Sequence, residues 1–411
     1  MQNLLNFTLQ SIFYLYGSLA LILSIQCLFD SNNNSSIFFI SSIVCFIIGY
    51  FLNLLFYNNH LKVKNFIITI FFSWLLLIIV SSIPFYSLIK VINLNSIIFI
   101  STSYITTTGF NLNSLNYLQE YEALIIWSSF IQLIGGFFSI ICFILFFLVL
   151  YNKHDKLVIF NKNLILRFFL YYFLLFIIYI FVLNFTLKDL LGSFMLASAI
   201  ISSGGIVGSN GHLLGFYFSD NNFLVVYSFL ILLTILILPF FLYIHNTRIL
   251  KTYYLKILKR SFFLIIILIF LFLLFINNSF LTLQESLFIF LSFLTTTGLL
   301  PNKVTNIMIL QQLYPLFFIF LILIMIGSFS GGSSGGLKID RVSILFIKIK
   351  DELTKLTMRH KVYGVDLIKK GSNQKELNSF YALISLGIFI IILAMLLLCI
   401  SGNSIFESFV F

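Results

Sequence analysis

Three clusters of Thr, Ser and Gly recur along the chain, each directly after a short apolar stretch. Their residues are Thr106, Thr107, Thr108 and Gly109; Ser202, Ser203, Gly204 and Gly205; and Thr295, Thr296, Thr297 and Gly298. The apolar stretches before them, 95–105, 192–201 and 284–294, are shorter than the about 20 residues that a membrane span requires. Nearly equal stretches of chain separate the clusters, which predicts one unit of helix, half-helix, polar loop and helix repeated three times.

The chemistry of these clusters suits a dehydrated monovalent cation. Backbone carbonyls can replace the hydration shell of such an ion, and Gly permits the backbone turns that aim several carbonyls at one axis. A half-helix that ends at the loop directs its negative end toward the ion. A divalent ion would need several carboxylates, and the clusters contain none, which favours K⁺ or Na⁺. Close helix packing by small residues is the structural alternative.

A fourth polar stretch differs from the three clusters. It follows a full apolar segment, 306–326, and precedes an amphipathic helix at about 339–358. Its many glycines disfavour a helix, so we expect a flexible break within the membrane that acts as a gate below the clusters. The candidate gate residues are Gly327, Gly331, Gly332, Ser333, Ser334, Gly335, Gly336 and Lys338. Lys338 is costly in lipid and should face a cavity or a group of carbonyls. A phosphate-binding loop is excluded because no strand precedes the glycines.

The elements that must position these loops are transmembrane helices. The 411 residues are 60% hydrophobic and only 9% charged, with a mean hydropathy of +1.10. This composition excludes a soluble domain and a disordered chain, and it predicts an all-α polytopic membrane protein. The long apolar segments are 11–29, 36–57, 65–88, 121–151, 165–185, 222–245, 262–280, 306–326 and 379–400.

The basic residues predict the orientation. Most of the 24 Lys and Arg fall in the segments 58–64, 152–167, 246–261 and 342–378, which places these segments and the N-terminus in the cytoplasm. The net charge of +11 therefore reflects membrane topology, and we expect a multi-pass protein of the inner (cytoplasmic) membrane with no nucleic-acid partner. The four cysteines lie in apolar runs without metal-ligand spacing, and the histidines are scattered, so we expect neither a cofactor nor an enzyme.

Several ordered motifs resemble the TrkH/KtrB family of bacterial potassium-uptake subunits. They are Phe72–Leu77 through Pro84; Thr106–Gly109; Trp127 with Gln132 and Gly135–Gly136; Ser203–Gly205; Thr295–Gly298; and Gly331–Lys338 with Arg341. The resemblance implies two N-terminal helices followed by helix–pore helix–helix repeats around a pseudo-fourfold pore. It also implies K⁺ as the transported ion, a homodimer in membrane lipid, and a cytosolic nucleotide-binding regulatory subunit of the TrkA/KtrA kind.

On this basis we divide the chain into an N-terminal helix pair and successive pore repeats. The expected units are 1–64, two transmembrane helices; 65–164, repeat 1; 165–261, repeat 2; 262–378, repeat 3 with the gate loop and a cytosolic segment; and 379–411, an incomplete repeat 4. Ser193 and Ser286 lie at the same distance before their filter glycines, and the same register applied to Ser408 places a fourth filter glycine near position 420. An inactive truncated remnant is therefore one alternative, and a secondary transporter with broken helices is the other.

Overall fold

The computed structural model describes most of the chain. The described residues are 2–29, 35–55, 63–89, 93–110, 122–151, 162–205, 221–235, 237, 265–266, 268–269, 282–301, 314–329, 332–357 and 374–402. The structural statements below concern these residues. The apolar segments expected at 222–245, 262–280 and 306–326 lie partly outside them, as does the end of the segment 379–411.

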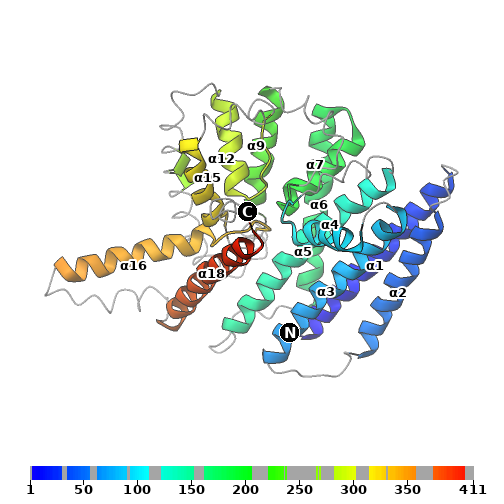
Figure 1. Ribbon diagram of the computed structural model, residues 1–411, viewed down its shortest axis with the longest axis horizontal. Helices are drawn as coiled ribbons and strands as arrows, with labels where there is room; N and C mark the ends of the chain where they lie inside the picture. Colours follow the sequence, from blue (N-terminus) through cyan, green and yellow to red (C-terminus); the bar gives the residue numbers. More distant parts are fainter. Residues whose placement is uncertain are drawn as a thin grey trace.

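The described chain is a series of helices (Figure 1). Their bounds are α1, Gln2–Phe29; α2, Ser35–Leu55; α3, Val63–Leu88; α4, Leu94–Thr106; α5, Glu122–Tyr151; α6, Lys162–Leu187; α7, Leu190–Ser202; α9, Asn221–Ile235; α12, Leu283–Leu294; α15, Tyr314–Ile326; α16, Ile339–Thr357; and α18, Gln374–Ile400. Five of them, α1, α2, α3, α5 and α6, contain apolar segments long enough to cross a membrane. The protein is therefore an all-helical, multi-pass membrane protein, as the composition predicts.

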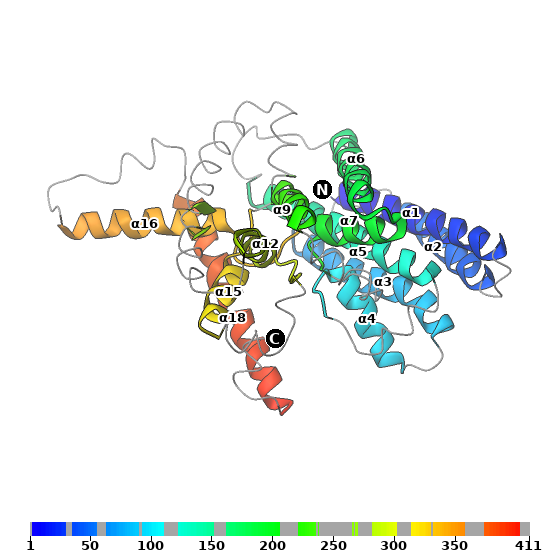
Figure 2. The same ribbon diagram turned by 90° about the horizontal axis from the view of Figure 1, so that it is seen from above.

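The helices from α1 to α16 follow one another roughly along the long axis of the molecule, and α18 returns toward its middle (Figures 1 and 2). The views in Figures 1 and 2 both place the α1–α2 pair at one end and α16 at the other. Each short helix packs against the longer ones around it: α4 lies between α3 and α5, α7 contacts α5, α6 and α9, and α12 contacts α9 and α15. The helix–half-helix unit of the sequence is thus present in space.

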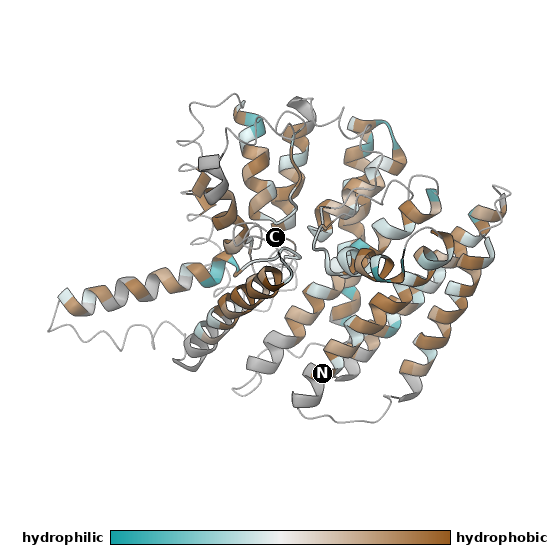
Figure 3. Cartoon of the chain, viewed as in Figure 1, coloured by the Kyte–Doolittle hydropathy of each residue, from teal (hydrophilic) through white to brown (hydrophobic). Residues whose placement is uncertain are grey.

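Apolar residues predominate along these helices (Figure 3), and many large apolar side chains are exposed. On α2, for example, Phe39, Ile40 and Phe51 are each more than half exposed. In such a helix every backbone donor and acceptor must be satisfied within the protein. Two buried serine hydroxyls are satisfied in the same way: Ser41 and Ser81 each donate to a carbonyl three residues earlier in their own helix.

Trp127 connects the N-terminal pair to the first repeat. Its indole nitrogen, on α5, donates to the carbonyl of Ser81 on α3 over 3.1 Å. Its ring also packs against Tyr16 of α1 and Phe38 of α2, and the side chain is fully buried. A buried indole needs such a hydrogen-bond partner, so this one residue fixes α5 relative to three other helices.

Candidate functional site

The three expected half-helices are confirmed within two residues. The stretches 95–105, 192–201 and 284–294 correspond to α4, α7 and α12. Their starts are capped differently: Asp189 accepts from Leu191 on α7, and Thr282 forms a reciprocal capping box with Glu285 on α12. Asn93 makes no such side-chain bond at the start of α4. Side-chain caps thus fix where α7 and α12 begin.

The half-helices end in one and the same backbone motif. In each case the amide of one residue donates to the carbonyl five positions earlier, and the amide before it donates to the carbonyl three positions earlier. The pairs are Thr108 to Ser103 and Thr107 to Tyr104; Gly204 to Ala199 and Ser203 to Ile200; and Thr297 to Ser292 and Thr296 to Phe293. This pattern is a Schellman motif, which closes a helix and turns the chain away from its axis.

The motif carries unusual backbone angles in all three clusters. Thr107, Ser203 and Thr296 have φ values of 56°, 54° and 58°, in the left-handed region where side chains other than Gly are strained. The closing glycines at 109, 205 and 298 have φ values of 82°, 63° and 68°. Strained residues that recur at equivalent positions are typical of functional sites.

The structure brings the three clusters together. A Cβ built on Gly109 would lie 3.1 Å from the carbonyl oxygen of Gly204, and one built on Gly205 would lie 1.7 Å from that of Thr297. Cluster 1 thus touches cluster 2, and cluster 2 touches cluster 3. Side chains at these glycines would occupy the space of neighbouring carbonyls, which explains the residue type independently of φ.

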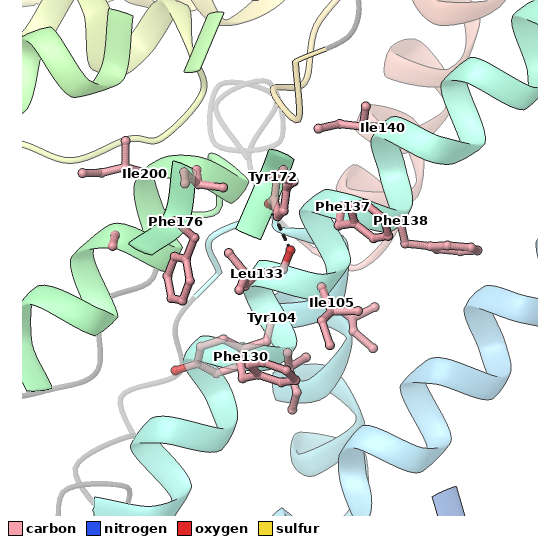
Figure 4. Packing of buried hydrophobic residues seen from close by; sticks show 14 of the residues in the cluster. Tyr104, Ile105, Phe130, Leu133, Phe137, Phe138, Ile140, Tyr172, Phe176 and Ile200 are labelled. Atoms are coloured by element: carbon pink, nitrogen blue, oxygen red, sulfur yellow. Dashed lines mark hydrogen bonds between the residues drawn. The ribbon is translucent and has the colours of Figure 1, made fainter. Parts of the chain in front are cut away.

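Helix α5 presents a notch of small residues to the ends of two half-helices. A Cβ on Gly135 would lie 1.9 Å from the carbonyl oxygen of Ile105, at the end of α4. One on Gly136 would lie 2.7 Å from the Cα of Ser202, at the end of α7. Figure 4 shows the surrounding core, in which the Tyr172 hydroxyl donates to the Leu133 carbonyl over 3.1 Å. Close packing by small residues, the structural alternative for the clusters, thus occurs on α5.

Two serines belong to the site although sequence reasoning passed over them. Ser103 Oγ donates to the carbonyl of Phe110 over 2.7 Å, and Ser292 Oγ donates to that of Leu299 over 2.8 Å. Each bond ties the last turn of a half-helix to the residue after the closing glycine of its cluster. Both serines precede their glycine by the same number of residues. An alignment of the repeats could therefore have identified them from the sequence.

The gate candidate is a compact loop rather than an open break. After α15 ends, Leu337 and Lys338 donate back to the carbonyls of Met325 and Ile326 over 2.8 and 2.7 Å. Gly327, at φ 68°, lies so close to Gly335 that a Cβ would come within 2.2 Å of its carbonyl oxygen. The expected break between 326 and 339 is confirmed, and so is the helix that follows it, as α16. Gly331 lies outside the described residues.

Lys338 faces carbonyls, as its cost in lipid requires. Its Nζ donates to the carbonyl oxygens of Ser334 and Gly332 and to Ser334 Oγ. Ser334 Oγ is also bonded to Ser328 Oγ. The Lys338 ammonium group therefore connects the middle of the loop to the start of α16, which follows Lys338 directly.

The loop is bonded directly to two of the three clusters. Ser333 Oγ donates to the carbonyl of Ile201 over 2.8 Å and accepts from Ser203 Oγ over 3.1 Å. The amide of Gly335 donates to Thr296 Oγ1 over 2.9 Å. Ser203 and Thr296 are the strained residues of clusters 2 and 3, so their left-handed backbone aims their hydroxyls at the loop. Among the contacts described, the hydroxyl of the equivalent Thr107 donates to the carbonyl of Thr106 and not to the loop.

These residues make an oxygen-rich site without acidic ligands. Within the described part of the chain, no group of three or more His, Cys, Asp or Glu is placed to hold a metal ion. The candidate ligands are backbone carbonyls and the hydroxyls of Ser and Thr. Such a set of neutral oxygens can coordinate an alkali cation, and it offers no nucleophile paired with a base.

The notch on α5 yields a stability prediction. Gly135→Ala should lower the free energy of unfolding by roughly 1–3 kcal/mol, because the new methyl group overlaps the Ile105 carbonyl. Gly17→Ala is the control, since its Cβ would meet only the edge of the Phe46 ring at 3.0 Å. Thermal unfolding of both purified variants in detergent measures the difference. Equal midpoints for Gly135→Ala and Gly17→Ala would contradict the close approach of α5 to α4.

Comparison with known proteins agrees with this architecture. No protein-family model matches the sequence, and no curated protein matches it. The structure is similar to a crystal structure of the potassium transporter TrkH from Vibrio parahaemolyticus, with a TM-score of 0.79 and 21% sequence identity. The match covers 100% of this chain and 88% of that one. The chain therefore has the fold of that transporter from one end to the other.

Proposed function

We propose that this chain is the pore-forming subunit of a K⁺ uptake system of the Trk/Ktr type in the cytoplasmic membrane. The observation that carries the proposal is the convergence of three identically shaped loops, each at the C-terminal end of a half-helix. The similarity in fold to a potassium transporter supports the choice of ion. K⁺ would bind at the three clusters 106–109, 202–205 and 295–298, and the loop 327–338 would gate its passage.

The geometry of the clusters fits the transport of a dehydrated ion. Each half-helix directs the negative end of its dipole into its cluster, and the left-handed turn that follows reverses the peptide planes. Carbonyl oxygens of one cluster come close to the backbone of the next, as those of Gly204 and Thr297 approach Gly109 and Gly205. Neutral oxygens bind a monovalent ion weakly enough for it to leave again.

The gate loop lies against the clusters, where it can obstruct the path of an ion. Its bonds from Ser333 and Gly335 to clusters 2 and 3 must break before the loop can move away. In the orientation that the basic residues predict, the loop is on the cytoplasmic side of the clusters. Helix α16, which starts at the loop and projects from the rest of the protein in Figure 1, would then form the first part of the basic cytosolic segment 342–378.

The remaining parts of the proposal concern assembly. A homodimer in membrane lipid and a cytosolic nucleotide-binding regulatory subunit of the TrkA/KtrA kind follow from the family resemblance. The start of α16 is where such a partner would act, because Ile339 donates to the carbonyl of Ser328 within the loop over 3.0 Å. A displacement of α16 would therefore be transmitted to the gate.

Ion uptake by the purified protein tests the function directly. Reconstituted in liposomes, the protein should admit K⁺ down a concentration gradient faster than Na⁺, measured with ion-selective dyes. Growth of a K⁺-uptake-deficient bacterium at low external K⁺ gives the same readout in cells. Flux no greater than that of empty liposomes for both ions, from folded protein, would contradict the proposal.

The filter glycines should differ in their tolerance of a methyl group. Gly298→Ala faces only the backbone cost of a left-handed alanine, about 1–2 kcal/mol, because nothing lies within 4 Å of its Cβ. It should still transport, with a lower K⁺/Na⁺ ratio. Gly205→Ala adds an overlap with the Thr297 carbonyl, so it should abolish transport. The proposed contact between clusters 2 and 3 would be refuted by a Gly205→Ala protein with the flux and selectivity of the wild type.

Removal of the Lys338 ammonium should loosen the gate. Lys338→Met keeps the length of the side chain but loses the donors that hold Gly332 and Ser334, bonds worth roughly 1.5–3 kcal/mol for a charged group. We expect basal K⁺ flux about tenfold higher, for a shift of about 1.4 kcal/mol in the gating equilibrium. Lys188→Met is the control, since Lys188 also has a positive φ, 54°, but is exposed at the junction of α6 and α7. A flux at or below the wild-type value would contradict this role.

A further inference from the structure

The second cluster differs from the other two in its side chains but not in its backbone. In clusters 1 and 3 a serine in the last turn of the half-helix pairs with a threonine of the loop. The Thr108 hydroxyl donates to Ser103 Oγ over 3.4 Å, and Ser292 and Thr297 hydroxyls are 3.1 Å apart. In the Schellman motif these are the two positions whose side chains normally touch.

This hydroxyl pair braces the loop. The serine of each pair is the residue that also reaches across to the chain after the filter glycine, at Phe110 and at Leu299. The threonine hydroxyl lies beside it, and in cluster 3 it donates to the Ser292 carbonyl as well, over 3.1 Å. The pair therefore links the helix end, the filter strand and the returning chain.

Cluster 2 has no such pair. Ala199 and Gly204 occupy the positions of the serine and the threonine, and neither has a hydroxyl. The backbone nevertheless has the same hydrogen bonds, with 3.1 Å for Gly204 to Ala199 and 3.1 Å for Ser203 to Ile200. Some other group must replace the missing brace.

The side chain of Gln132 occupies the space of the missing threonine. A Cβ built on Gly204 would lie 2.2 Å from Gln132 Nε2 and 2.9 Å from its Cδ and Cγ. Gln132 is on α5 and is fully buried, one turn before the notch that receives α4 and α7. Gly204 does not have a positive φ, so close approach by Gln132, and not backbone conformation, accounts for glycine at this position.

We propose that Gln132 is a positioning residue for the second filter segment, whose amide replaces the Ser–Thr pair of the other two. A buried carboxamide offers both donors and an acceptor, and burial without hydrogen bonds would be costly. Hydrogen bonds from the amide to the backbone around Gly204 would hold that backbone in place. The same bonds would satisfy the donors and the acceptor of the buried amide. The inference rests on the proposed function, because it assigns to Gln132 a part in setting the selectivity of the same pore.

The first test separates hydrogen bonding from space filling. Gln132→Leu keeps the approximate volume and removes the amide. We expect the K⁺/Na⁺ flux ratio in liposomes to fall on the order of tenfold, with the amount of folded protein, judged by size-exclusion elution, unchanged. Ser129→Ala, on the same helix and donating to the Ile125 carbonyl one turn earlier over 2.9 Å, is the control and should keep the wild-type ratio.

The second test introduces the Ser–Thr hydroxyl pair of clusters 1 and 3 into cluster 2. Gly204→Thr alone should lose transport, because its side chain overlaps Gln132. The triple variant Gln132→Ala, Ala199→Ser, Gly204→Thr should recover the selectivity that Gln132→Ala loses, since room and hydroxyls are then both present. This rescue is a non-additive effect, which independent sites would not show.

The outcomes distinguish this inference from the proposed function. If the wild type carries no K⁺, the proposed function fails, and no statement about selectivity remains. If the wild type is selective and Gln132→Leu is equally so, the positioning role is wrong and Gln132 only fills space. If Gln132→Leu does not fold, the triple variant decides: recovered selectivity supports the role, and a triple variant as poor as Gln132→Ala overturns it.

Discussion

The whole structure depends on one constraint: inside a membrane, each backbone donor and acceptor must find its partner within the protein. A half-helix that ends at membrane depth violates this rule unless its last carbonyls are satisfied locally. The three clusters satisfy it in one way, with two amides that turn back onto carbonyls three and five positions earlier. The same turn produces the left-handed residues at 107, 203 and 296. The shape proposed to bind an ion is thus first of all a solution to the problem of ending a helix in lipid.

Much of this arrangement was predictable from the sequence because its causes are local. The bounds of α4, α7 and α12 follow from short apolar stretches closed by Thr, Ser and Gly, and the amphipathic pattern from 339 onward predicted α16. The fold class follows from composition alone. Lys338 was expected to face carbonyls because the cost of burying a charge leaves few other choices.

The contacts between distant segments were not predictable in the same way. Nothing in the pattern near Gly204 indicates that Gln132, on another helix, lies against it. The bonds from Ser333 to Ser203 and from Gly335 to Thr296 also join residues more than a hundred, and nearly forty, positions apart. Such contacts depend on how the helices pack, and in this protein the packing is set by Gly135, Gly136 and the anchoring of α5 through Trp127. The division into repeats stays a prediction.

The bonds between the loop and the strained residues of clusters 2 and 3 have a thermodynamic consequence. Ser203 and Thr296 belong both to the candidate ion site and to the contact with the loop. Two events that share residues in this way are coupled, and coupling is reciprocal. If displacement of the loop changes the affinity of the clusters for an ion, then occupancy by that ion must change the equilibrium of the loop by the same factor. The permeant ion would be an effector of its own gate, so external K⁺ would set the open probability as well as the driving force.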